Sequence, residues 1–411
     1  MVCNDCLMIS EFAMFWVAVY QRYTALSKGE HNMKLFHCSD LHLGKRMFER
    51  SLLEDQRYLI DQICRLAALH RPDGILISGD VYDKTIPPVE AVHLLDDFLT
   101  QLHRMGICVY LIAGNHDSAG RLDFGRRCLE EQNVHICGMF NGTLAHVEKQ
   151  DAYGTVHFYL LPFLKPALVL PYAGSAAIST YADAVRWALQ TVTIDPAARN
   201  VLLAHQFVTW NGIAEQSDSE VKMLGGVDAI DASLLFGFDY VALGHLHSPQ
   251  RIGKDTIRYA GSPMKYSFSE LRQKKGLMMV ELREKGDISM EFLPLEPLHE
   301  MREIRGNFVD LLEAARECGG TEDYIRVILT DSGIVYDPVR RLQAYYPNLM
   351  TLERAERREM RIATVWKEMP QEEMGISLFS QFFEKQNGKS MDGHQRKIAE
   401  TVWKEMEEES K

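Results

Sequence analysis

The sequence predicts a mixed α/β fold, either one mixed sheet or a two-sheet sandwich, with helices on the outside. After Met33, short apolar runs alternate with segments of helical periodicity, which is the pattern of βαβ units. Towards Leu298, β-rich runs joined by turns replace this alternation. The composition is typical of a globular protein, with 46% hydrophobic and 25% charged residues, and 411 residues are enough for two or more domains.

The main domain is expected to span residues 33–298. Apolar periodicity predicts three helices, which cover Leu52–Leu69, the segment after Pro87-Pro88, and about Leu122–Glu131. Buried strands are expected at five apolar runs, namely LFHCS, GILIS, VYLIA, VLLA and YVALG. Later strands are expected at Thr155–Phe163, Arg258–Ala260 and Gly276–Leu282, and Phe292 and Leu293 close the domain.

A smaller α/β unit is expected at residues 299–356. Its predicted order is strand, helix, strand, helix, strand, at Met301–Arg305, Phe308–Arg316, Tyr324–Leu329, Pro338–Tyr345 and Leu349–Leu352. Gly319-Gly320 and Pro347 mark the breaks between elements. We expect no catalytic residue in this unit.

The two ends of the chain differ from the rest. Residues 1–32 are expected to be an extension outside the fold, with Met33 as the natural start, although a helix packed on the protein is the alternative. Residues 357–411 are predicted to form charged helices with apolar clusters, one of them at Leu378, Phe379, Phe382 and Phe383. The tail also holds two similar segments, 361–369 and 397–406, whose likeness is either a repeat or a coincidence. Such amphipathic helices either pack on their own domain or bind a partner helix.

The charge and the cysteines limit the class of protein. The formal net charge of −12 means that any DNA binding needs local basic patches or bound metal ions. Most of the eight cysteines are scattered in apolar contexts, which indicates reduced thiols in a cytoplasmic protein. Cys3 and Cys6 form a CxxC without a second pair, so we expect no zinc site there. The apolar stretch Leu7–Tyr20 is too short to span a membrane, and no membrane association is expected.

Each of the five apolar runs ends in residues that can bind metals. Parallel strands lying side by side would bring these ends to one edge of a sheet, where open α/β sheets place their sites. The candidate ligands are two aspartates, one asparagine and four histidines: Asp40, His42, Asp80, Asn115, His205, His245 and His247. Such a set suits a pair of hard or borderline divalent ions.

The spacing of these residues suggests phosphoester chemistry. The two oxygens of Asp80 can bridge two cations, and two metals roughly 3.5–4 Å apart can clamp a phosphate and activate a water. His116 follows Asn115 directly, so it should point elsewhere and serve as a donor to the leaving or non-bridging oxygens. We expect Asp117 to orient the His116 ring and Asp83 to support the ligands. The other histidines are expected to be surface or core residues.

These motifs resemble those of the calcineurin-like metallophosphoesterases. The segments SDLHLGK, GDVYDKTIPP and GSPMKYSFSE are similar, more narrowly, to the SbcD family of nuclease subunits. The resemblance implies one metal held by Asp40, His42, Asp80 and His247, a second held by Asp80, Asn115, His205 and His245, and a catalytic role for His116. It also implies manganese, whereas the donor set alone admits iron or zinc.

The resemblance extends to activity and partners. It implies a DNA exonuclease on double-stranded ends and an endonuclease on single strands and hairpins, acting in DNA repair, recombination and replication. The 299–356 unit would be a capping domain that meets DNA, and the tail would bind an SbcC-type coiled-coil ATPase. Helices 89–105 and 122–131 would form a nuclease homodimer within a heterotetramer. Candidate phosphate contacts are Lys45, Arg46, Arg50, Lys265, Arg272, Lys274 and Lys275.

Two alternatives remain open at this point. The first is a small-substrate phosphomonoesterase or phosphodiesterase on the same dimetal scaffold, which would have no need of a cap or a tail. The second is a scaffold subunit that only holds partners, which predicts broken ligand motifs, whereas all of them are intact here. No P-loop GxxxxGK[ST] appears, so any ATPase site must lie on a partner.

Overall fold

The computed structural model describes residues 32–174, 177–220, 228–331, 333–355, 379–380, 383–384 and 390–409. The chain divides into two compact units, Met1–Glu353 and Arg354–Lys411. Residues 1–31, segment 361–369, Leu378 and Phe382, on which several sequence predictions fall, lie outside the described residues. No helix in the described part of the chain is long and apolar enough to cross a membrane.

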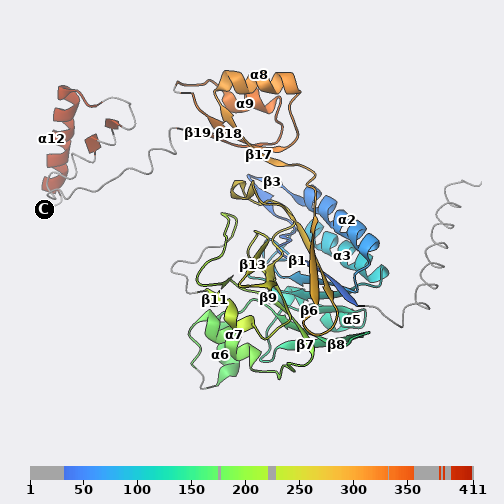
Figure 1. Ribbon diagram of the computed structural model, residues 1–411. Helices are drawn as coiled ribbons and strands as arrows, with labels where there is room; N and C mark the ends of the chain where they lie inside the picture. Colours follow the sequence, from blue (N-terminus) through green and yellow to red (C-terminus); the bar gives the residue numbers. More distant parts are fainter. Residues whose placement is uncertain are drawn as a thin grey trace, which may run out of the picture. The chain divides into compact units, whose positions relative to one another are not determined.

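Two six-stranded sheets form the centre of the first unit (Figure 1), which confirms the predicted sandwich. The first sheet has the order β16-β15-β1-β4-β5-β6, with β1 Met33–Cys38, β4 Gly74–Ser78, β5 Cys108–Ile112, β6 Val134–Cys137, β15 Gly276–Leu282 and β16 Ile288–Pro294. The second has the order β13-β14-β12-β9-β8-β7, with β7 Ala145–Asp151, β8 Gly154–Leu161, β9 Arg199–His205, β12 Tyr240–Gly244, β13 Gln250–Ile252 and β14 Lys254–Tyr259. The strands β1, β4, β5 and β6 run parallel, as do β8, β9, β12 and β14.

The central strands are apolar throughout because both of their faces are buried. Alternate residues such as Leu76, Tyr110 and Leu203 meet between the two sheets. Their neighbours, such as Ile75 and Ile77, face the other way, towards the helices. The sheets are therefore inner layers, and each needs a cover on its outer face.

Helices provide this cover on both sides (Figure 1). The first sheet is covered by α2 Leu53–His70 and α3 Val89–Arg104, close to the predicted positions. The second is covered by α6 Pro166–Ala173 and α7 Tyr181–Leu189, neither of which was predicted from the sequence. A capping box between Thr180 and Asp183 starts α7.

The predicted helix Leu122–Glu131 is confirmed only in part. The structure has two short helices there, α4 Ala119–Leu122 and α5 Arg126–Glu130. Gly125 between them has a φ of 74°, a left-handed conformation that interrupts a helix. Shorter elements complete the unit: β2 Arg46–Met47, β3 Arg50–Ser51, β10 Val208–Thr209, β11 Ile230–Asp231, η1 Ala232–Leu235 and η2 Phe268–Glu270.

The small α/β segment has the predicted order of elements. They are β17 Met301–Gly306, α8 Phe308–Cys318, β18 Tyr324–Leu329, α9 Pro338–Gln343 and β19 Leu349–Arg354, with the sheet order β17-β18-β19. The segment has its own core, yet it also bonds to α2 of the sandwich. The buried carboxylate of Asp55 accepts hydrogen bonds from the Tyr324 hydroxyl at 2.5 Å and from His299 Nδ1 at 3.0 Å. In the second unit, α12 covers Gly393–Glu409.

Candidate metal centre

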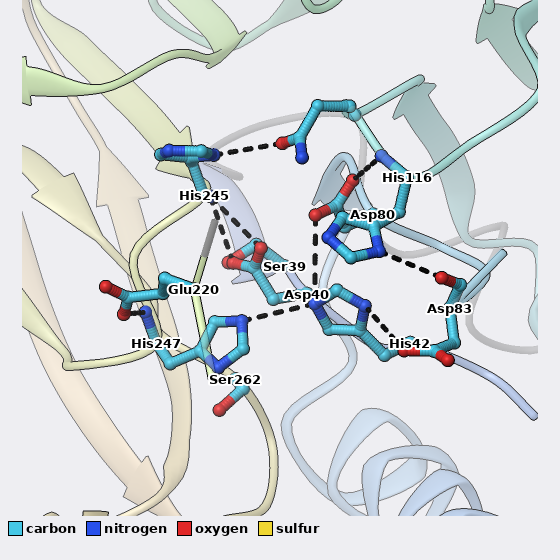
Figure 2. A network of polar contacts seen from close by, with 12 residues as sticks. Ser39, Asp40, His42, Asp80, Asp83, His116, Glu220, His245, His247 and Ser262 are labelled. Carbon is cyan, nitrogen blue, oxygen red and sulfur yellow. Dashed lines mark hydrogen bonds and ion pairs between the residues drawn. The ribbon is translucent and has the colours of Figure 1, made fainter. Parts of the chain in front are cut away.

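The five strand ends meet at one edge of the sandwich, but they come from two sheets. β1, β4 and β5 belong to the first sheet, while β9 and β12 belong to the second. The expectation that all five strands lie side by side is therefore wrong. The face-to-face packing of the sheets brings their carboxyl ends together, and Figure 2 shows the side chains that gather there.

One group of donors comprises Asp40, His42 and His247. One ligand atom from each lies within 4.8 Å of the other two, and all three residues are buried. The Nε2 atoms of His42 and His247 face each other at 3.1 Å. Two ring nitrogens at this distance repel unless a proton or a cation lies between them, so the pair is suited to bind a cation.

A second group surrounds the Asn115 amide oxygen. This oxygen lies 3.0 Å from His205 Nε2 and 3.0 Å from His245 Nδ1. Asp80 Oδ2 lies 3.4 Å from His205 Nε2 and 3.7 Å from His42 Nε2, so its carboxylate stands between the two groups. All seven predicted donors thus gather at one place, in two sets that share Asp80.

The turns that carry these donors have unusual backbone conformations. Asp40, His42 and Asp80 have φ values of 54°, 44° and 49°, and His245 has a φ of 106°. Non-glycine residues with positive φ are uncommon, and such strain concentrates at functional sites. Backbone hydrogen bonds hold the turns together, from Asp40 N to Gly79 O at 3.0 Å and from His42 N to Asp80 O at 2.9 Å.

A glycine directly precedes three of the donors, and at each of these positions a side chain would collide with neighbouring atoms. A Cβ on Gly79 would lie within 3.0 Å of the His205 ring, one on Gly114 within 3.0 Å of the Asp80 carboxylate, and one on Gly244 within 3.0 Å of Ser78 O. Real Cβ atoms essentially never make such contacts. The glycines of the sequence motifs therefore let the turns pack closely around the donors.

Hydrogen bonds to Nδ1 of two histidines fix their rings so that Nε2 faces the site. His205 Nδ1 lies 2.8 Å from Ser78 O, which leaves Nε2 pointing into the site. His247 Nδ1 lies 2.7 Å from Ser219 Oγ and 3.4 Å from Glu270 Oε1. Glu270 is fully buried and pairs with Lys275 Nζ at 2.7 Å.

Ser219 and Glu270 were not predicted from the sequence, nor was Glu220, which accepts from the His247 amide at 2.6 Å (Figure 2). Their only sequence signal is the position of Glu270 in the GSPMKYSFSE segment. The prediction that Lys275 contacts phosphate is wrong, because its ammonium is buried against Glu270 and His247 O.

The electrostatics of the site favour a bound cation. Burial lowers the pKa of His42 well below its usual value and that of His245 to about 3, so both rings are neutral at pH 7. Burial also acts on Asp80, but His205 outweighs it and holds the pKa of Asp80 well below its usual value. Burial acts to lower the pKa of His205, whereas Asp80 raises it to about 9. A cation that binds at His205 Nε2 therefore releases a proton.

His116 lies beside the donors, as predicted, but its partner differs from the predicted one. Its Nδ1 lies 2.8 Å from the backbone oxygen of Asp83, and its amide donates to Asp80 Oδ1 at 2.8 Å (Figure 2). The Asp117 carboxylate instead accepts from the backbone amides of Gly114, Val81 and Tyr82 at 2.8–3.1 Å. The prediction that Asp117 orients the His116 ring is therefore wrong. The Asp117 carboxylate instead joins its own loop, which begins at Gly114, to the loop that follows Asp80.

The other predicted contributors are spread around the site. Asp83 Oδ1 lies 2.7 Å from Lys45 Nζ and 3.7 Å from His42 Nδ1, which agrees with a supporting role. Lys265 pairs with Glu300, and Arg50 bonds to Asn348 in the small α/β segment. Arg46, Arg272 and Lys274 are exposed. His37 is a buried core residue held by Tyr240 and Leu243 O.

The sandwich and its donor cluster define the class of protein. Residues 33–249 match the family model described as calcineurin-like phosphoesterase, more than half of the chain. Residues 297–387 match the model described as type 5 capsule protein repressor C-terminal domain. The fold and site are thus those of a metallophosphoesterase, an enzyme class that uses divalent metal ions.

The comparison with curated proteins is narrower. The SbcD subunit of the SbcCD nuclease from Staphylococcus saprophyticus is 35% identical over 323 residues, which cover 78% of this chain and 84% of that protein. The protein of the same name from Staphylococcus epidermidis is 34% identical over 324 residues, covering 78% and 85%. The chain belongs to this SbcD family of metal-dependent nuclease subunits. A solved dimetal phosphatase from Danio rerio aligns at 12% identity with a TM-score of 0.39, covering 66% of this chain and 98% of that one, which is too distant to support a conclusion.

Proposed function

We propose that this protein hydrolyses phosphodiester bonds at DNA ends and hairpins, as the nuclease subunit of a complex with an SbcC-type coiled-coil ATPase. The observation that carries the proposal is the convergence of seven donors in two sets around Asp80, with His116 beside them. DNA repair, recombination and replication are the processes such a nuclease would serve, and a cytoplasmic location remains a prediction from the sequence.

The donor sets fit two divalent cations. Asp40, His42, Asp80 and His247 would hold one ion, and Asp80, Asn115, His205 and His245 the other. One observation supports this fit: the buried Nε2 atoms of His42 and His247 face each other at 3.1 Å. Mn²⁺ is the ion we propose. When bound, the ions would polarise the phosphate and lower the pKa of a water nucleophile.

His116 supplies the proton chemistry in this proposal. Because Nδ1 is held by the Asp83 carbonyl, Nε2 is the nitrogen left to meet the substrate. A proton held there would go to the leaving oxygen of the phosphodiester as the bond breaks. The Lys45–Asp83 ion pair beside it would keep this loop in place.

The rest of the chain would bind the DNA substrate and the partner ATPase. We propose that residues 33–298 form the nuclease domain, residues 299–356 a capping domain that contacts DNA, and residues 357–411 the tail that binds the ATPase. A homodimer of nuclease subunits within a heterotetramer completes the proposed assembly. Exposed Arg46, Arg272 and Lys274 are the proposed phosphate contacts, since the net charge of −12 requires local basic residues.

The test is cleavage of hairpin and linear duplex DNA with and without Mn²⁺, with the partner ATPase present. We expect Mn²⁺-dependent cleavage that falls about 10²–10⁴-fold in His116→Ala, with metal content unchanged. Glu284→Ala, which changes an exposed residue on the β15–β16 turn, is the control and should keep full activity. Equal activity of the wild type and His116→Ala would refute the proposed role of His116. Turnover of an aryl phosphate without any DNA cleavage would favour a small-substrate phosphoesterase.

A further inference from the structure

A second cluster of metal-binding side chains lies on the β7–β8 hairpin, outside the site described above. His146 and Glu148 are two residues apart on β7, so their side chains lie on the same face of the strand. His157 on β8 is the direct cross-strand partner of Glu148. The backbone register thus places all three side chains next to one another on one rigid hairpin.

The distances within this cluster suit a shared ion. His146 Nε2 lies 2.8 Å from His157 Nδ1. Glu148 Oε1 lies 3.6 Å from His157 Nδ1 and 3.9 Å from His146 Nε2. Nitrogen and oxygen ligands about 2.0–2.2 Å from a tetrahedral zinc ion are about 3.3–3.6 Å from each other. The three observed distances bracket that range, so small side-chain rotations are enough.

The surroundings hold the two rings in place without covering them. The His146 ring stacks on Tyr159 at 4.8 Å and on His157 at 5.0 Å. The side chains of His146, His157 and Glu148 are 31%, 17% and 58% exposed, so an ion can reach them from solvent.

The cluster is separate from the donors at the strand ends. His157 pairs with Asn200 on β9, and His205 lies at the end of that same strand. At about 3.3 Å per residue, five residues of strand correspond to about 16 Å. His157 also shares its face of β8 with Tyr159 and Leu161, which point away from the partner sheet. An ion here therefore would not touch the nuclease centre.

We propose that His146, Glu148 and His157 bind one Zn²⁺-class ion, with the fourth position open to water or another ligand. Two imidazoles and one carboxylate suit zinc or copper, and the Irving–Williams order makes such a site much weaker for Mn²⁺. The site would therefore fill independently of the ions at the nuclease centre. Because it joins the edge strand β7 to β8, the bound ion would clamp the outer hairpin of the second sheet.

The test measures how many zinc ions each chain binds. The full chain is dialysed against micromolar ZnCl₂, and zinc per chain is measured for the wild type, the double variant His146→Asn/His157→Asn, and the surface control His93→Asn. The nuclease centre contributes equally to all three, so the difference isolates the hairpin. We expect one ion fewer per chain in the double variant and no loss in the control. Equal zinc contents, or a difference that needs millimolar zinc, would overturn the proposal.

A second variant keeps the proposal testable if the double variant does not fold. Glu148→Gln keeps the shape of the hairpin and removes the charged ligand, so we expect its zinc affinity to fall about tenfold or more. If the double variant fails to fold, an unchanged affinity in Glu148→Gln overturns the proposal. Mn²⁺-dependent DNA cleavage should be unchanged in Glu148→Gln, so failure here is distinguishable from failure of the proposed nuclease function.

Discussion

Glu270 determines how His247 is presented to the candidate metal centre. The carboxylate lies 3.4 Å from His247 Nδ1, accepts from Ser219, and pairs with the buried Lys275 at 2.7 Å. Burial acts to raise the pKa of Glu270, but His247 and Lys275 lower it to about 2, so it is charged at neutral pH. A carboxylate behind a metal-binding histidine fixes the ring and raises its basicity.

Replacing this charge should weaken metal binding more than folding. In Glu270→Gln we expect the Mn²⁺ concentration for half-maximal DNA cleavage to rise about 10–100-fold, with activity restored at high Mn²⁺. The measurement is a Mn²⁺ titration of cleavage, with Glu284→Gln on the β15–β16 turn as the matched control. An unchanged Mn²⁺ requirement in Glu270→Gln would show that the carboxylate only fills space.

The glycine before Asn115 should tolerate no side chain. In Gly114→Ala, the new Cβ would collide with the Asp80 carboxylate, which stands between the two donor groups. Displacing Asp80 by about 1 Å should reduce cleavage about 10²-fold. Gly237→Ala is the control, because a Cβ there meets nothing within 4 Å. Normal cleavage by Gly114→Ala would contradict the packing described for this turn.

Residue identities could be predicted from the sequence better than their contacts. The seven donors and His116 were found because each follows an apolar run, a pattern local in the chain. Asp117 was misassigned because adjacency to His116 says nothing about where its carboxylate points. Glu270 was missed because it reaches His247 across 23 residues of sequence with no repeating pattern.

At the scale of elements, a buried ion pair ties the edge of the second sheet to its neighbours. Arg199, at the start of β9, donates to Asp151 on β7 at 2.8 Å and to Arg283 O at 2.9 Å. Asp151 also accepts from the Met33 amide at 2.9 Å, at the start of β1. The two side chains of the pair are 4% exposed. One carboxylate thus joins β1, β7 and β9.

This ion pair should make stability depend on pH. Burial acts to raise the pKa of Asp151, but Arg199 outweighs it, so the folded-state pKa is lower than the unfolded value of about 3.9. The stabilisation is therefore present above about pH 4 and is lost as pH falls through the lower folded-state pKa. Asp151→Asn should cost about 1–3 kcal/mol at pH 7 and progressively less below pH 4.

Urea unfolding at pH 7, 5 and 3.5 measures this difference, with Asp255→Asn in an exposed pair as the control. A stability difference between the wild type and Asp151→Asn that stays constant over this range would contradict the assignment.

The pairing of strands into two sheets was the element-level feature least visible in the sequence. Runs such as VLLA and YVALG indicate buried strands, but they do not say which sheet each one joins.

At the scale of the whole first unit, the small α/β segment is fastened to the sandwich through Asp55 on α2. Tyr324 and His299 both donate to its carboxylate, and Arg50 reaches Asn348 at 2.7 Å. In Tyr324→Phe, one oxygen of the buried carboxylate loses its donor, which should cost about 1–3 kcal/mol of stability. Urea unfolding checks this, and the exposed Tyr336→Phe should leave stability unchanged. If Tyr324→Phe left the stability unchanged, the apolar contacts alone would hold this segment.

The order of elements along the first unit could largely be predicted, since periodicity and turn residues are local signals. The exceptions are instructive: α6 and α7 were missed between 166 and 189, and Gly125 split a helix that apolar spacing had suggested was continuous. The assembly of the centre from two sheets depends on long-range packing, which no single segment encodes.

The proposal that the seven donors hold two divalent ions can be tested in the crystal. Anomalous diffraction from crystals soaked in Mn²⁺ tests it most directly. We expect two manganese peaks, one beside Asp40, His42 and His247 and one beside Asn115, His205 and His245, with the Asp80 carboxylate between them. A single peak, or none among these residues, would contradict it.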